Sequence, residues 1–234
     1  MTGKEKTNSD KNTVKLLGVA FLVQAVASVV SNLILLEPLI VSGNIIDSMT
    51  NIANHSSQLR ASIVVEMITV MAIVMLGSLL FITLKKQNGK IALVAFGLYL
   101  VEVAILAASR IPAFALLRTS QESVLAGHPA YLQTLGNLFY DLQDFGNWLH
   151  MLPFALGATL WYYLFYKSGY IPRLLNLWGL IAAPLALIGT LFVLFDYDIP
   201  LLVFLPNLPF ELAIGLWLLI KGVKDQQPAL TEAG

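Results

Sequence analysis

Residues 61–84, ASIVVEMITVMAIVMLGSLLFITL, decide the fold of this chain, because they form a long apolar run that one acidic residue, Glu66, interrupts. The hydrocarbon core of a bilayer is about 30 Å thick, and a helix needs about 20 mostly apolar residues to cross it. This stretch is long enough to span a membrane. A carboxyl group inside such a stretch is costly to place in lipid, so Glu66 is a candidate functional residue.

Five further stretches have similar length and apolar character. The predicted spans are residues 14–36, 61–84, 91–109, 148–166, 174–195 and 201–220. Lipid offers the backbone no hydrogen-bond partner, so a span is a helix or a strand of a closed barrel, and the chain has no series of alternating strands. We predict an all-α integral membrane fold, a six-transmembrane-helix bundle over residues 14–222, with polar tails at 1–13 and 223–234.

The composition agrees with a lipid environment. The chain of 234 residues is 57% hydrophobic and 12% charged, whereas soluble domains have about 25% charged residues. Basic and acidic residues balance at 14 each, and no basic patch favours a nucleic-acid partner. The chain has no cysteine, which excludes disulfides, thiolate metal sites and cysteine nucleophiles. The predicted partner is the lipid bilayer, and no cofactor is predicted.

The distribution of basic residues predicts the orientation. One side of the predicted bundle carries Lys4, Lys6, Lys11, Lys15, Lys85, Lys86, Lys90, Lys167, Arg173, Lys221 and Lys224, and the other carries Arg60, Arg110 and Arg118. Basic loops stay in the cytoplasm, so both termini are predicted to be cytoplasmic. Residues 25–27, Ala-Val-Ala, have the form of a signal-peptidase site, so cleavage stays an alternative. The length of the 14–36 run favours a permanent span.

Two loops on the outer side contain helical patterns. Within residues 42–58, Ile45, Ile46, Met49 and Ile52 form an apolar stripe that predicts a short helix at the membrane interface or capping the bundle. Tyr131, Leu135, Leu138 and Leu142 recur at helical spacing before the fourth predicted span. One or two short interfacial helices are therefore expected outside the membrane.

Three spans each contain one glutamate: Glu66, Glu102 and Glu211. The rise per residue places them about 8, 10 and 15 Å from the outer ends of their spans, so they can reach a similar level. A carboxylate in the middle of a membrane helix costs roughly 3 kcal/mol, and it needs a cation, donors or a proton. Arg60 and Arg110 are candidate partners for Glu66 and Glu102, respectively.

The sixth predicted span contains a local break. Pro206-Asn207-Leu208-Pro209 removes two backbone donors just before Glu211, so we predict a broken or kinked helix there. Such breaks occur in the binding sites of transporters, and also as ordinary kinks that a neighbouring helix covers. Both interpretations stay open.

A metal site is the less favoured interpretation of the outer mouth, where Asp141, Asp144 and His150 lie. His150 is about 120° around a helix from Asp144, and no HExxH or similar pattern places two ligands on one face. A serine nucleophile in a GxSxG turn is also missing. We predict no metal ligands and identify no catalytic residues.

Several sequence strings resemble one family. These are residues 132–136 (LQTLG), 161–164 (WYYL), 171–173 (IPR), 178–181 (WGLI) and 216–222 (LWLLIKG). They resemble the bacterial membrane family called domain of unknown function 4386, over nearly the whole chain after its first dozen residues. The family pattern has glutamates at the positions of Glu66, Glu102 and Glu211. The resemblance implies a six-helix protein of the bacterial inner membrane and no established activity.

Three functions remain open. The first is a non-enzymatic membrane protein that binds a small ligand, lipid or proton in an outward-facing polar cluster of Glu66, Glu102, Glu211, Arg110 and Asp144. The second is an intramembrane metal-dependent hydrolase, which would use the carboxylates and His150. The third is a structural or partner-binding protein in which the polar groups only join helices.

Overall fold

Every regular element in residues 3–223, the part of the chain described by this computed structural model, is helical. The elements are α1 (Gly3–Val29), a π-helical segment η1 (Val30–Leu36), a 3₁₀ turn η2 (Glu37–Leu39), α2 (Ile45–Asn54), α3 (Ser56–Leu84), α4 (Gly89–Ala108), α5 (Arg110–Leu125), α6 (Ala130–Leu149), α7 (Met151–Ser168), α8 (Arg173–Leu194), η3 (Leu201–Val203) and α9 (Asn207–Ile220). The all-α prediction is confirmed for these residues. Of the predicted tail at 223–234, residues 224–234 lie outside them.

Four helical stretches among the described residues are long and apolar enough to cross a membrane. They are Lys11–Leu39, Ser56–Leu84, Gly89–Leu125 and Arg173–Leu194, and they contain the first, second, third and fifth predicted spans. The fourth predicted span coincides largely with α7. The sixth contains α9, whose 14 residues extend about 21 Å. The chain therefore has the helices of a membrane protein.

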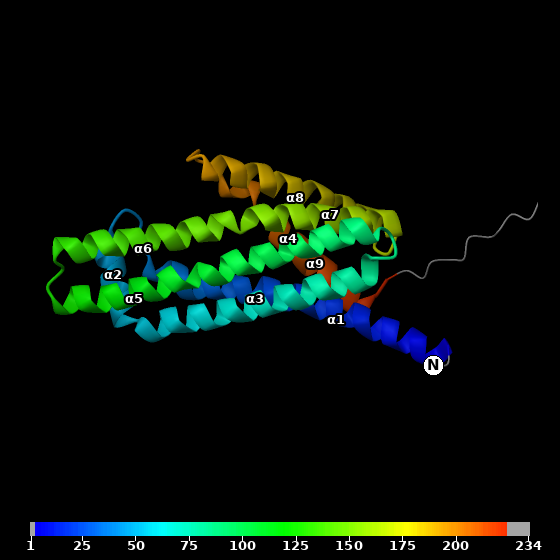
Figure 1. Cartoon of the computed structure of the whole chain (residues 1–234), viewed down its shortest axis with the longest axis horizontal. Helices are drawn as coiled ribbons and strands as arrows, with labels where there is room; N and C mark the ends of the chain where they lie inside the picture. Colours follow the sequence, from blue (N-terminus) through cyan, green and yellow to red (C-terminus); the bar gives the residue numbers. More distant parts are fainter. Residues whose placement is uncertain (1–2, 224–234) are drawn as a thin grey trace, which may run out of the picture.

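The helices form a bundle with two tiers along its length (Figure 1). The longer tier contains α1, α3, α4, α7, α8 and α9, with α1 packed against α3 and α9, and α4 against α3 and α7. The shorter tier contains α2, α5 and much of α6 and lies at the end opposite the N-terminus. We call these the main tier and the outer tier.

Each tier has its own hydrophobic core. The main core includes Phe21, Trp161, Phe165 and Phe210, all fully buried. The outer core joins α2 to α5, and both to η1, η2 and the start of α3, through residues that include Met49, Ile52, Leu116 and Leu117. The predicted stripe of residues 42–58 is thus confirmed as a short helix that caps the bundle.

The predicted helix before the fourth span is also present, but its apolar stripe does not form the core. Tyr131, Leu135, Leu138 and Leu142 are all exposed on α6. The buried face of α6 instead includes Gly136 and Gly146. The reason is steric, because a Cβ on Gly136 would lie 2.5 Å from the Met49 sulfur and one on Gly146 would lie 2.5 Å from Ser109 Cβ.

Two long helical arms, α4 with α5 and α6 with α7, pack side by side, and each is interrupted partway along its length. α4 ends and α5 begins at Ser109, and α6 ends and α7 begins at His150. Each break lies three residues before a proline, Pro112 or Pro153, and proline removes a donor from the helix and disfavours helical conformation before it. Gly146 lets the two arms touch at this level.

A close backbone contact of the main tier joins α1 to α9. A Cβ placed on Gly18 would lie 2.7 Å from the Gly215 carbonyl oxygen and 2.7 Å from the Leu219 nitrogen. Small residues permit such backbone contact between membrane helices. This contact holds α9 against the first helix of the chain.

We expect Gly18→Leu to destabilise the protein by about 1–3 kcal/mol, because the new side chain must push α1 away from α9. Thermal unfolding followed by circular dichroism in detergent micelles measures the change. Gly97→Leu is the matched control, since a Cβ there meets nothing within 4 Å. Equal stability of the two variants would contradict the close contact.

Candidate functional site

Two adjoining cavities lie within the bundle near the level at which the long arms break. The inner cavity has a volume of about 300 Å³, and its polar lining is Gln24, Ser28, Asn32, Thr69, Glu102, His150, Asn207 and Glu211. The second cavity, which we call the vestibule, has a volume of about 410 Å³, and its polar lining is Asn32, Glu37, Tyr140, Gln143, Asp144, Asn147, Trp148 and His150. The buried polar side chains that line one of these cavities are Gln24, Thr69, Glu102, Gln143, Asn207 and Glu211.

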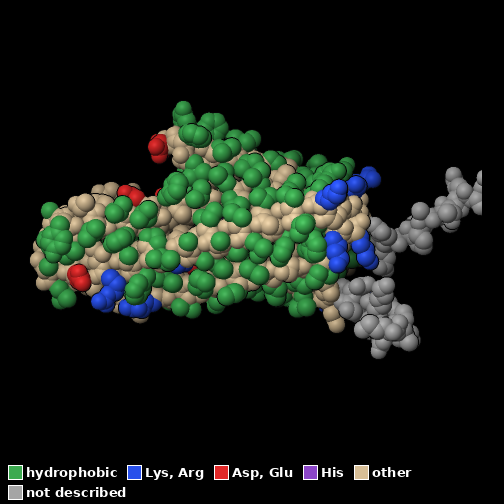
Figure 2. All heavy atoms as spheres, viewed as in Figure 1, with side chains coloured by type: hydrophobic (Ala, Val, Ile, Leu, Met, Phe, Trp, Pro, Cys, Tyr) green, Lys and Arg blue, Asp and Glu red, His purple; other side chains and the backbone are tan. Residues whose placement is uncertain are grey.

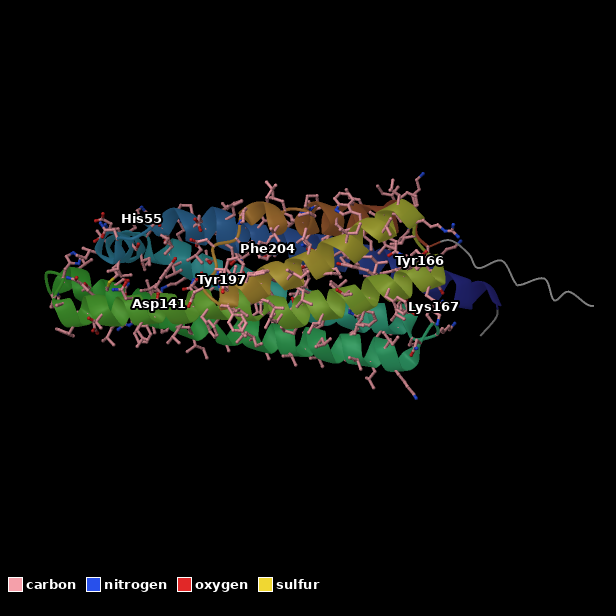
Figure 3. The ribbon with its side chains drawn as sticks, turned by 90° about the horizontal axis from the view of Figure 1, so that it is seen from above. His55, Asp141, Tyr166, Lys167, Tyr197 and Phe204 are labelled. Carbon is pink, nitrogen blue, oxygen red and sulfur yellow. The ribbon has the colours of Figure 1, made fainter. Side chains whose placement is uncertain are left out.

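The two cavities share part of their walls. Asn32, Leu106, His150, Met151 and Phe204 line both. Phe204 lies about halfway along the bundle, between Asp141 at the outer tier and Lys167 at the opposite end (Figure 3). The inner cavity and the vestibule therefore follow one another from the middle of the bundle toward the outer tier.

Glu66 reaches this site through one intermediate residue. Its side chain on α3 is 1% exposed, and its Oε2 accepts a hydrogen bond from Asn32 Nδ2 at 2.9 Å. Asn32 lies in the π-helical segment η1, and such segments are frequent at functional sites. Glu66 itself does not line either cavity, whereas Asn32 lines both.

Glu211 lines the inner cavity from the second turn of α9. Its Oε2 accepts a hydrogen bond of 2.8 Å from Gln24 Nε2 on α1. Both side chains are buried. A donor from the neighbouring helix thus offsets part of the cost of burying this carboxyl group.

Glu102 differs from the other two glutamates. Its side chain on α4 is 2% exposed and lines the inner cavity, yet its Oε2 has no hydrogen-bond partner. Unpaired buried polar atoms are rare, and each requires an explanation. Of the three predicted glutamates, Glu102 and Glu211 share one cavity, and Glu66 lies beside it.

The two arginines bind groups other than the expected glutamates. Buried Arg110 donates to Ser109 Oγ, at 2.9 Å from Nη2, and to Asn147 Oδ1. Exposed Arg60 lies over the Phe114 ring, with 5.6 Å between the guanidinium carbon and the ring centroid. The expected partnerships of Arg110 with Glu102 and of Arg60 with Glu66 are absent from the hydrogen bonds of the described residues. Arg110 opens α5 beyond the break at Ser109, so its side chain faces α6 and not the interior of α4.

Asp144 lies at the vestibule and not in the inner cavity. Desolvation in the vestibule raises the pKa of the Asp144 carboxyl, and the negative charges of Asp141 and Glu37 raise it further, against a hydrogen bond with the Trp148 side chain that lowers it. Asp144 is thus an acidic group in the vestibule, on the side of the inner cavity that faces the outer tier.

The residues considered for a metal site do not converge. Asp144 and His150 line the vestibule, but Asp141 lines a separate outer pocket beside α2. Within residues 3–223, no group of three histidine, aspartate or glutamate side chains is arranged to hold a metal ion.

The break before α9 is covered by α8 and also borders the inner cavity. Trp178 Nε1 donates to the Pro206 carbonyl oxygen at 3.1 Å, and Asn207 Nδ2 donates to the Ala182 carbonyl oxygen at 3.2 Å. Asn207 also lines the inner cavity. The two interpretations of this break are therefore compatible, because a neighbouring helix satisfies its polar groups while it forms part of the cavity wall.

Sequence reasoning missed the contribution of α1. Gln24, Ser28 and Asn32 all line the inner cavity, and their spacing of four residues places them on one face of a helix. This polar stripe inside an apolar span is visible in the sequence. Neutral amide and hydroxyl groups cost less to place in a membrane helix than carboxylates do, so they indicate a site less strongly. We had expected the site between the helices that carry the three glutamates.

Comparison with known proteins gives one match. The family model described as "Domain of unknown function (DUF4386)" matches residues 16–222, which confirms the resemblance seen in the sequence. Neither the curated proteins nor the solved structures contain a match to this chain.

We expect Asn32→Leu to destabilise the fold by about 1–3 kcal/mol, because it leaves the buried Glu66 carboxyl without its donor. The double variant Asn32→Leu with Glu66→Leu should recover part of that loss, since both partners are then apolar. Thermal unfolding in micelles measures four proteins: the parent, Asn32→Leu, Glu66→Leu and the double variant. Costs that simply add in the double variant would show that the two side chains do not interact.

A second expectation concerns pH. Because the folded-state pKa of Asp144 is raised, the stability contributed by its protonated form is full below the unfolded pKa and decreases as pH rises to the folded pKa. Asp144→Asn should therefore raise the melting temperature at pH 8 and leave it nearly unchanged at pH 3. The exposed Glu122→Gln serves as the control, with little change expected at either pH. A stabilisation by Asp144→Asn that is equal at both pH values would contradict this assignment.

Proposed function

The chain belongs to this family of unknown function, and from its own geometry we propose that it is a multi-pass membrane protein that binds a small ligand in the inner cavity. In this proposal the ligand reaches the inner cavity from outside through the vestibule. The protein acts by binding and not by catalysis. Both termini are cytoplasmic, and the membrane is the bacterial inner membrane.

One observation carries the proposal. Five residues, of which Asn32 and His150 are polar, line both the inner cavity and the vestibule, so the two cavities share a wall on the way from the outer tier to Glu102 and Glu211. Helices that were only held together by interhelical hydrogen bonds would need no such space. Cavities with a mostly apolar wall and a few polar groups are the usual form of small-molecule sites.

Six crossings are supported by the arrangement of the main tier. α7 and α9 lie within this tier beside the four longer apolar stretches. α9 extends about 21 Å, so the residues that precede it must share its crossing. Non-helical backbone at such a depth is tolerated where protein covers it, and α8 provides the partners of Pro206 and Asn207.

The charge distribution supports the proposed orientation. Figure 2 shows lysine and arginine side chains in one group at the end of the bundle nearest the N-terminus, where Figure 3 places Lys167, and in another group toward the opposite end. Acidic side chains lie toward the opposite end, where Figure 3 places Asp141. Cytoplasmic loops are enriched in basic residues, so the vestibule opens to the outside.

Labelling of single cysteines tests this function directly, because the chain has none of its own. Ser28→Cys reports on the inner cavity and Glu37→Cys on the vestibule. We expect both to react with a membrane-impermeant sulfonated maleimide added to intact spheroplasts, since water reaches both thiols. Mass spectrometry of the purified protein measures the labelled fraction.

Two variants are matched controls. Val64 is 61% exposed on α3 within an apolar stretch, so Val64→Cys should stay unlabelled in lipid. Lys167→Cys should react only after the membrane is permeabilised. Labelling of Glu37→Cys without Ser28→Cys would refute the accessible inner cavity, and labelling of Lys167→Cys in intact spheroplasts would refute the orientation.

A further inference from the structure

The charged groups of the inner cavity have one sign. Its lining includes the carboxyl groups of Glu102 and Glu211, and no lysine or arginine belongs to that lining as described. The nearest buried arginine, Arg110, bonds with Ser109 and Asn147 on the other side of the break. The protein therefore surrounds this space with acid and leaves the corresponding cation to be supplied from elsewhere.

Glu102 shows where such a cation would bind. Glu66 accepts a hydrogen bond from Asn32 of η1 and Glu211 from Gln24 of α1, whereas Glu102 Oε2 has none although the side chain is 2% exposed. A buried carboxylate needs charged or hydrogen-bonding partners. An ammonium group in the inner cavity would give Glu102 that partner through a charge-assisted hydrogen bond.

The remaining wall of the inner cavity is apolar. Leu106, Met151, Phe154, Phe204 and Leu208 are part of it. Aliphatic and aromatic groups bind hydrocarbon, and aromatic faces also attract cations. A hydrated inorganic ion fits such a wall poorly, whereas an ammonium carried on an apolar body suits both halves of the lining.

The path toward the inner cavity also favours cations. The vestibule is lined by Glu37 and Asp144, and no lysine or arginine is among its described lining residues. Clefts lined by charges of one sign raise the local concentration of the opposite ion. The outer tier would thus attract a positively charged solute to the vestibule.

The amino end of α9 is the one feature that could favour an anion, because Asn207 and Leu208 line the inner cavity. Its free donors are few, since the Asn207 nitrogen donates to the Phe204 carbonyl oxygen and Pro209 has no N–H. Glu211 in the next turn already places negative charge near this end of the helix. The negative charge of the two carboxyl groups therefore exceeds the partial positive charge at the amino end of α9.

We propose that the ligand of the inner cavity is an organic cation, in which an ammonium group binds Glu102 beside Glu211 and an apolar body packs against Phe154 and Phe204. This assignment rests on the proposed function, and it adds the chemical class of the ligand. The ammonium could belong to a free amine or to the head group of an aminophospholipid. The chemistry at Glu102 is the same in both cases.

Three probes with the same phenylalkyl body test the charge requirement: phenethylammonium, 2-phenylethanol and 3-phenylpropionate. Isothermal titration calorimetry at pH 7 on the full chain in micelles, with empty micelles subtracted, gives each Kd. We expect the cation to bind at least about tenfold more tightly than the alcohol, since a charge-assisted hydrogen bond is lost in the alcohol. No binding of the carboxylate is expected.

Variants locate the site. Glu102→Gln should weaken phenethylammonium binding at least about tenfold while leaving the weak binding of the alcohol unchanged. Glu122→Gln is the control, because it makes the same change at an exposed glutamate that lines neither cavity, and it should bind the cation as the parent protein does. Melting temperatures recorded without ligand show that each variant is folded.

A second arm identifies the source of the ammonium. Short-chain phosphatidylethanolamine and phosphatidylglycerol are added separately to the micelles, and the melting temperature is measured. Stabilisation by the ethanolamine lipid alone, lost in Glu102→Gln, would assign the ammonium to a lipid head group. Tight binding of phenethylammonium with no such lipid effect would assign it to a free amine.

The outcomes separate this inference from the proposed function. Equal binding of the alcohol and the cation, tighter binding of the carboxylate, or cation binding that Glu102→Gln leaves unchanged would overturn the cation assignment. If no probe and no lipid binds while Ser28→Cys is still labelled from outside, the inner cavity remains accessible and only the cation assignment fails. If Ser28→Cys is also unlabelled, the proposed function fails as well.

Discussion

The packing of α1 against α3 and α9 is the constraint on which the site depends. This helix brings Asn32 to Glu66 and Gln24 to Glu211, and these amides offset the cost of burying two carboxyl groups in an apolar bundle. The contact requires Gly18 opposite Gly215, because a larger residue would separate the backbones. The same surface of α1 forms one wall of the inner cavity.

The prolines at 112 and 153 give the protein its second feature, a common level at which both long arms break. Beyond this level α5 and α6 continue into the outer tier, past the ends of α8 and α9 (Figure 1). At the break before α9, the Pro206 carbonyl oxygen accepts a hydrogen bond from Trp178, and the Asn207 side chain donates one to the Ala182 carbonyl oxygen of α8. Irregular backbone can therefore border a cavity within the bundle without unsatisfied polar groups.

The hydrogen-bond pattern explains why the three glutamates have different roles. Glu66 bonds with Asn32 of the preceding helix, and such a bond fixes how helices pack. Glu211 has both a donor and a position in the cavity wall. Glu102 lines the inner cavity, but no side chain donates a hydrogen bond to its Oε2. The cost of burying this carboxyl group is therefore not offset by a donor at Oε2.

The sequence by itself determined the helical class, the apolar stretches, the helix that caps the outer end, the break before α9 and the three acidic residues. It could do so because apolar length, helical periodicity and proline chemistry act over short distances along the chain. The family resemblance was also readable from local strings of residues.

Only the tertiary structure decided which side chains meet. It gave Glu66 an amide partner in place of Arg60, left Glu102 Oε2 without a partner, turned the apolar stripe of α6 outward, and added Gln24, Ser28 and Asn32 to the site. These outcomes depend on helix rotation and on steric contacts such as that of Gly146 with Ser109. Helix rotation and such contacts depend on residues that are far apart in the chain, so a local sequence pattern does not predict them.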